Sequence, residues 1–89
     1  MEKEHPLVYI IVLNWNNYKD TEECINSLNL MSYPNYRVVI VDNGSHDNSG
    51  WMLHKQFPEH IFLFNRQNFG YAEGNNIGIK KAVKLGANY

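Results

Sequence analysis

The sequence predicts an α/β fold in which three strands alternate with three helices around one parallel sheet. Three short apolar runs lack the alternation of a strand with a solvent-facing side, and their β-branched and aromatic residues suit strands covered on both faces. Apolar residues at helical spacing follow each run, which gives the order β-α-β-α-β-α and implies right-handed crossovers. A chain of 89 residues is long enough for one domain.

The three apolar runs predict strands over residues 7–13, 36–41 and 61–64. Each run ends abruptly in a polar residue, namely Asn14, Asp42 and Asn65. Because the carboxyl ends of parallel strands lie at one edge of a sheet, these three polar ends are expected to come together.

The first helix is expected to begin at Asp20 or Thr21, either of which can cap it, and to run to about Leu30. Its apolar residues recur on one expected face, namely Cys24, Ile25, Leu28 and Met31. The second helix is expected over residues 49–57, where Pro58 ends it.

The third helix is expected from residues 71–73 to about Leu85, with Gly86 as its C-terminal cap. Its predicted sheet-facing residues are Ile79, Ala82 and Val83.

Composition excludes several functional classes. A net charge of −1 provides no basic field for nucleic acid, so no nucleic-acid partner is expected. One cysteine, Cys24, excludes a disulfide framework and a thiolate metal cluster. The first apolar run is far shorter than a membrane span, so a cytoplasmic location is expected, with the inner face of the membrane as a variant. The histidines show no metal-binding spacing and are interpreted as surface residues, namely His5, His46, His54 and His60.

The loops after the predicted strands are rich in amides, carboxylates and glycines, and each permits two interpretations. Asp42 and Asn43 form either a simple turn or a carboxylate and an amide that bind a base or a ribose. Trp15 and Tyr18 are either core aromatics or a face on which a base stacks. The glycines of residues 70–78 either let a helix approach the sheet or let a ligand approach the backbone.

Three segments resemble family 2 glycosyltransferases. Residues 9–16 (YIIVLNWN) are similar to that family's first strand and loop, typically V-I-I-V-N-Y-N. Residues 39–47 (VIVDNGSHD) resemble its V-V-D-N-G-S-x-D element. Residues 68–78 (NFGYAEGNNIG) resemble the N-x-G-F-A-x-G-N-N-x-G stretch of its rhamnosyltransferase-like branch. All three occur in the family's order and spacing.

The resemblance implies a three-layer βαβαβα, Rossmann-like half of the GT-A nucleotide-diphospho-sugar transferase fold. Residues 1–6 are expected to form a disordered tail, and the resemblance implies residues 7–89 as a truncated, N-terminal nucleotide-sugar-binding domain. The implied base and ribose site comprises Leu13, Asn14, Trp15, Asn16, Asp42 and Asn43. The segment that would border the ribose and diphosphate contributes Gly70, Gly74 and Asn75. Many family members carry Arg where this chain has Asn75, a difference shared by the rhamnosyltransferase-like branch.

The family's D-x-D motif is expected after Tyr89, together with the general base and the acceptor pocket. Mg²⁺ or Mn²⁺ is therefore expected as the cofactor of the longer enzyme, with ligands outside this chain. No catalytic or metal-binding residue is predicted within the 89 residues, which are not expected to transfer a sugar alone. The implied donor is a UDP- or dTDP-sugar, and the implied acceptor is a glycan or a lipid-linked sugar.

Two other functions are alternatives to the donor-binding half. One is a non-catalytic interaction module derived from a GT-A domain. The other is a phospho-receiver, which needs an acidic pair after the first strand, where this chain has Asn14, Asn16 and Asn17 instead. An unpaired sheet edge also predicts self-association through that edge.

Overall fold

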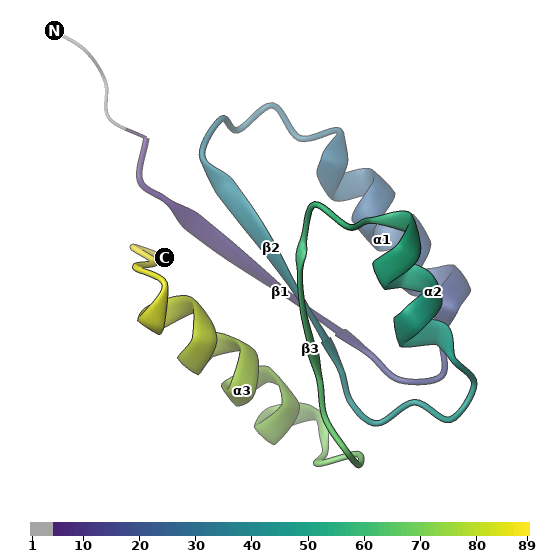
Figure 1. Cartoon of the computed structure of the whole chain (residues 1–89). Coiled ribbons are helices and arrows are strands. Elements are labelled where there is room, and N and C mark those ends of the chain that lie inside the picture. Colours follow the sequence, from purple (N-terminus) through teal and green to yellow (C-terminus); the bar gives the residue numbers. More distant parts are fainter. Residues whose placement is uncertain (1–4) are drawn as a thin grey trace, which may run out of the picture.

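The computed structural model describes residues 5–89 and confirms the predicted alternation. The elements in chain order are β1 (Val8–Asn14), α1 (Tyr18–Asn29), β2 (Tyr36–Asp42), α2 (Ser49–Gln56), β3 (Ile61–Phe64) and α3 (Tyr71–Lys84). The strands are parallel and lie in the order β1-β2-β3. Helices α1 and α2 cover one face of the sheet and α3 covers the other, which gives three layers (Figure 1).

The helix ends follow from local hydrogen bonds. Helix α1 begins at Tyr18, earlier than predicted, because the side chain of Asn17 accepts the N–H of Asp20 and caps the helix. Helix α3 ends at Lys84 with Leu85 as its C-terminal cap, and Gly86, the predicted cap, follows with a φ of 96° that suits glycine. The N–H of Gly86 donates to the carbonyl of Val83 at 3.1 Å and closes the last turn.

The face under α1 and α2 contains the hydrophobic core, whose buried members are Val12, Ile25, Val38, Ile40, Leu53 and Phe57. The prediction that Cys24 lies on the buried face of α1 was wrong, since its side chain is exposed. Helix α1 buries Thr21 and Ile25, one turn apart, and this stripe turns Cys24 outward.

The α3 face is built differently from the prediction. Ile79 and Val83 were expected to face the sheet, but their side chains are 49% and 68% exposed. Helix α3 instead buries Gly74, Gly78 and Ala82. A Cβ at Gly78 would lie 2.7 Å from Cγ2 of Ile11, so the helix approaches the strand more closely than a larger residue allows.

Both described ends of the chain lie beside the amino end of β1 (Figure 1). The N–H of Tyr9 donates to the carbonyl of Tyr89 at 2.8 Å, so the last residues pair with the outer edge of β1. Residues 1–4 of the predicted disordered tail lie outside the described residues, whereas the carbonyl of His5 accepts Nδ2 of Asn35 at 2.8 Å. The division of the chain at residue 7 and the self-association through a sheet edge stay predictions. Across residues 5–89, no helix combines the length and the apolar character that crossing a membrane requires.

Candidate functional site

Asn14, the last residue of β1, is fully buried at the carboxyl edge of the sheet. Its Nδ2 donates to Oδ1 of Asp42 at 2.9 Å and to Oγ of Ser49 at 2.8 Å. Its Oδ1 accepts the hydroxyl of Thr21 at 2.7 Å. One amide therefore joins β1 to β2 and to both helices of that face, and its hydrogen-bonding groups are directed into the protein.

Asp42 ends β2 beside Asn14 and is 5% exposed. Its Oδ1 accepts the hydroxyl of Ser45 at 2.6 Å, and its Oδ2 accepts the N–H of Ser45 at 3.1 Å. The start of α2 packs directly on this carboxylate, because a Cβ at Gly50 would lie 2.6 Å from its Cγ. Residues 42–45 therefore form a turn that Asp42 closes by accepting from Ser45. Binding of a base or a ribose by Asp42 stays a prediction.

Asn43 follows β2 and is 2% exposed. Its Nδ2 donates to Oδ1 of Asn68 at 3.0 Å and to the carbonyl of Gly70 at 3.2 Å. Its Oδ1 accepts Nδ2 of Asn65 at 3.0 Å and the N–H of Phe69 at 3.2 Å. All four hydrogen-bonding positions of this amide hold the loop between β3 and α3 against the sheet edge.

Exposed groups lie around this buried polar floor. Trp15 is 48% exposed, and Asn16, with a φ of 49°, donates its N–H to Oγ of Ser45 at 2.9 Å. In the loop after β3, Arg66, Gln67 and Phe69 line a cavity of about 320 Å³. An exposed tryptophan in the loop after β1 and a guanidinium in the loop after β3 therefore border this edge of the sheet.

The start of α3 contacts the floor through a glycine. A Cβ at Gly74 would lie 2.8 Å from Cδ1 of Leu13 and 3.0 Å from Nδ2 of Asn43. Gly70, whose φ of 87° favours glycine, is exposed, and Asn75 is half-buried. Close packing accounts for Gly74, whereas Gly70 leaves open space beside the site.

All nine predicted site residues thus lie at or next to the carboxyl edge. Buried positions are taken by Asn14, Asp42, Asn43 and Gly74. Accessible or half-buried positions are taken by Leu13, Trp15, Asn16, Gly70 and Asn75. Sequence reasoning missed Thr21 and Ser45 as members of the network, because a hydroxyl in a helix or turn carries no signal of its partner.

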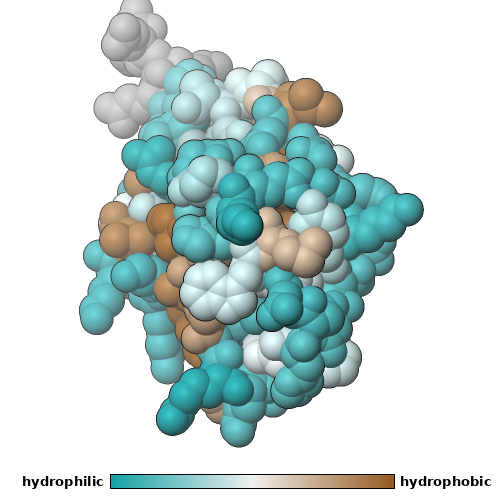
Figure 2. Space-filling model, turned by 45° about the vertical axis from the view of Figure 1, so that its right-hand side comes forward, coloured by the Kyte–Doolittle hydropathy of each residue, from teal (hydrophilic) through white to brown (hydrophobic). Residues whose placement is uncertain are grey.

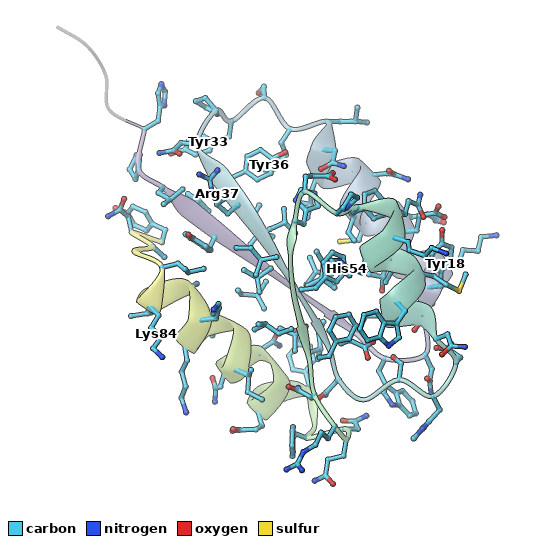
Figure 3. The ribbon with its side chains drawn as sticks, in the orientation of Figure 1. Tyr18, Tyr33, Tyr36, Arg37, His54 and Lys84 are labelled. Atoms are coloured by element: carbon cyan, nitrogen blue, oxygen red, sulfur yellow. The ribbon has the colours of Figure 1, made fainter. Side chains whose placement is uncertain are left out.

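The structure places Tyr18, for which the sequence permits two interpretations, and corrects the prediction for two histidines. Tyr18 is half-buried, and its hydroxyl donates to Oε2 of Glu22 at 3.0 Å. It lies on the side of the sheet covered by α1 and α2, away from the carboxyl edge (Figure 3). Burial, aided by Glu22, raises its pKa. His54 and His60 were expected on the surface, but His54 packs against the ring of Phe62 at 4.8 Å, and the side chain of His60 is 11% exposed. Both histidines therefore pack against aromatic rings, His54 against Phe62 and His60 against Phe57.

Comparison with known proteins decides the family. The family model for glycosyl transferase family 2 matches residues 9–84. The chain belongs to glycosyl transferase family 2. This membership agrees with the three resembling motifs, and the rhamnosyltransferase-like branch stays a prediction.

Relatives of this family 2 chain carry glycosyltransferase names. It is 32% identical over 77 residues to an uncharacterized glycosyltransferase of Rickettsia conorii, covering 85% of this chain and 13% of that protein. It is 33% identical over 79 residues to the uncharacterized glycosyltransferase EpsJ of Bacillus subtilis, covering 86% of this chain and 23% of that protein. The chain therefore spans less than a quarter of these relatives.

A solved structure has the same fold. The mannosyltransferase PcManGT of Pyrobaculum calidifontis, determined in complex with GDP-Man and Mn²⁺, superposes with a TM-score of 0.76 at 23% identity. The match covers 89% of this chain and 25% of that one. The three strands and three helices correspond to a GT-A, Rossmann-like half of a family 2 domain.

The part of the chain that the structure describes holds no cluster of metal-binding side chains. Within residues 5–89, no three His, Cys, Asp or Glu side chains lie close enough to hold a metal ion. The Asp42 carboxylate at the edge is occupied by Asn14 and Ser45. Asp47, in the same loop, accepts the N–H of Ser49 at 2.9 Å, and hydrogen bonds from Ser49 lower its pKa.

Proposed function

We propose that this chain is the donor-binding part of a glycosyltransferase that takes a sugar from a nucleoside-diphosphate sugar. The observation that carries the proposal is the carboxyl edge, where Asn14, Asp42 and Asn43 hold three loops around one accessible surface. Ligands of open parallel sheets bind at this edge. Family membership and the named relatives support a transferase, and a UDP- or dTDP-sugar is the proposed donor.

Buried residues of the candidate site are proposed to position its loops, and exposed residues are proposed to contact the nucleotide. Asn14, Asp42 and Asn43 position the loops, because their hydrogen bonds run to other protein groups. Trp15, 48% exposed, provides the face on which a base stacks. The backbone from Gly70 to Asn75 borders the diphosphate, and the guanidinium of Arg66 supplies the nearest positive charge in that loop.

Sugar transfer itself is proposed for a longer protein that contains residues beyond this chain. A divalent cation would there neutralise charge on the leaving diphosphate, and a glycan or lipid-linked sugar would be the acceptor. The alternative is an interaction module that keeps the GT-A half without binding a donor. A nucleotide-binding measurement separates these two functions.

The test is an NMR titration of this chain with UDP, dTDP and GDP, each with and without Mg²⁺. We expect chemical shifts to change in residues 13–17, 43–46 and 68–75. Amides of the core under α1 and α2, such as that of Leu53, should not respond. A well-dispersed spectrum that responds to none of the nucleotides would favour the interaction module.

Two exposed aromatic residues provide a matched pair of variants. Trp15→Ala removes the proposed stacking face, and we expect a loss of about 1–3 kcal/mol, which is roughly 5- to 150-fold in Kd. Tyr89 is 75% exposed and lies at the amino end of β1, where its carbonyl accepts the N–H of Tyr9. Tyr89→Ala should leave the nucleotide Kd unchanged. Equal effects of both variants would contradict the assignment of the base to Trp15.

A further inference from the structure

The second half of α3 concentrates positive charge. Lys80, Lys81 and Lys84 are three of the eight Lys and Arg residues in a chain whose net charge is −1. Among the described residues, the only ion pair within 4.0 Å joins His60 to Glu59, so none of these lysines pairs with an acid there. The lysines are therefore available to an external anion.

The same lysines border an apolar groove. Their side chains, with Leu63 of β3 and Ile77 of α3, line a cavity of about 390 Å³. Long lysine side chains cover apolar surface with their methylene groups and keep the ammonium in water. The groove thus presents an apolar floor and a cationic rim.

Exposed apolar side chains lie on the other side of the lysine row. Ile79 and Val83 are one helical turn apart and are 49% and 68% exposed. Leu85, just after the helix, is 43% exposed. From residue 77 to residue 85 there is no acidic residue. We call this surface, made of Ile79, Lys80, Lys81, Val83 and Lys84, the lysine face.

Helix chemistry alone explains only part of the lysine face. Cations near a helix C-terminus are favoured by the helix dipole, which accounts for Lys81 and Lys84. Lys80, however, stands four residues before Lys84, where two like charges repel each other. The dipole also gives no reason for the exposure of Ile79 and Val83. A binding surface accounts for all of these features together.

We propose that the lysine face docks this domain on an anionic phospholipid bilayer. Exposed apolar side chains beside a row of lysines, on a helix with no acid in its second half, are the features of a helix that lies in a membrane interface. The ammonium groups would bind lipid phosphates while Ile79 and Val83 enter the headgroup region.

The shape of the surface favours a bilayer over an acidic protein segment. Helix α3 forms the outer layer on its side of the sheet, and Lys84 projects from it away from α1 and α2 (Figures 1 and 3). Hydrophobic surface bordered by outward-pointing hydrophilic side chains runs down the left-hand side of Figure 2. Apolar groups on both sides of the lysine row suit a broad, flat partner, whereas a peptide in the groove would leave Ile79 and Val83 uncovered.

The test is co-sedimentation of this chain with vesicles of phosphatidylcholine alone and of phosphatidylcholine mixed with phosphatidylglycerol. We expect binding to the mixed vesicles only, weakening as salt is raised. Each lysine near an anionic surface contributes about fivefold in partitioning, so the variant with Lys80→Gln, Lys81→Gln and Lys84→Gln should bind about a hundredfold more weakly. Added UDP should not change the binding, which separates this test from the nucleotide titration.

Two further variants make the test specific. Lys19→Gln combined with Lys55→Gln removes two exposed lysines from α1 and α2, and vesicle binding should change by less than about twofold. Ile79→Ser with Val83→Ser keeps every charge and should still weaken binding. Failure to bind the mixed vesicles, or equal losses with the Lys19 and Lys55 control, would overturn the proposal. Binding to polyglutamate but not to vesicles would overturn it in favour of an acidic protein partner.

Discussion

The two faces of the sheet are packed by opposite means. Under α1 and α2, large side chains such as Ile25 and Leu53 fill the space and are fully buried. Under α3, glycines bring the helix backbone against the strands, and Gly74 contacts both Leu13 and Asn43 of the candidate site. The difference indicates that the first face supplies most of the stability, whereas the second sets where residues 70–75 lie relative to the site.

The largest effect is expected on the face under α1 and α2. Leu53→Ala leaves a cavity in the core and should lower the free energy of unfolding by about 2–5 kcal/mol, measured by urea denaturation. Leu30, 86% exposed, is the matched control, and Leu30→Ala should change stability by no more than about 0.5 kcal/mol. Similar losses in the two variants would show that the core is not where the structure locates it.

On the α3 face, Gly74→Ala should cost less stability than Leu53→Ala but should weaken nucleotide binding more. In Gly74→Ala the added Cβ meets Leu13 at 2.8 Å and Asn43 at 3.0 Å. Overpacking exceeds the gain in helix propensity, for a net cost of about 1 kcal/mol. The nucleotide-induced shifts in residues 70–75 should nevertheless disappear, because the helix start moves away from the edge.

Lys80→Ala, on the exposed side of the same helix, is the control for Gly74→Ala and should keep the shifts. If Gly74→Ala retained nucleotide binding while losing as much stability as Leu53→Ala, the proposed division between the two faces would be wrong.

The smallest effect concerns pH and the start of α2. Asp47 accepts hydrogen bonds from Ser49, which hold its pKa below the ordinary value. A lowered pKa in the folded state means stabilisation above the pKa of the unfolded chain and loss as pH falls through the folded pKa. Thermal melts of the parent chain and of Asp47→Asn should therefore converge as the pH falls through this acidic range. A constant difference at every pH would exclude the carboxylate as its source.

Much of the fold could be predicted from the sequence because its signals are local. The apolar runs predicted the bounds of the strands to within one residue, and Pro58 marked the end of α2. The buried side of α3 was predicted wrongly, since hydropathy favours Ile79 and Val83. The helix instead turns its glycines to the sheet, because positions without a Cβ allow the closest approach.

The candidate site was predictable in its location but not in its internal arrangement. The rule for parallel sheets correctly brought Asn14, Asp42 and Asn65 to one edge. Whether a polar side chain points to solvent or to a neighbour depends on partners far away in sequence, such as Thr21 and Ser49 around Asn14. A single sequence contains no record of such partners, so the buried network emerged only from the structure.

The pairing of the last residues with the first strand has a consequence for synthesis on the ribosome. Leu7 and Asn88 are 81 residues apart in sequence, yet the N–H of Leu7 donates to Oδ1 of Asn88 at 3.0 Å. At about 5–20 residues per second, roughly 4–16 s separate the translation of these two partners. During that interval the outer edge of β1 has no partner from its own chain, and a chaperone or a neighbouring nascent chain can reach it first.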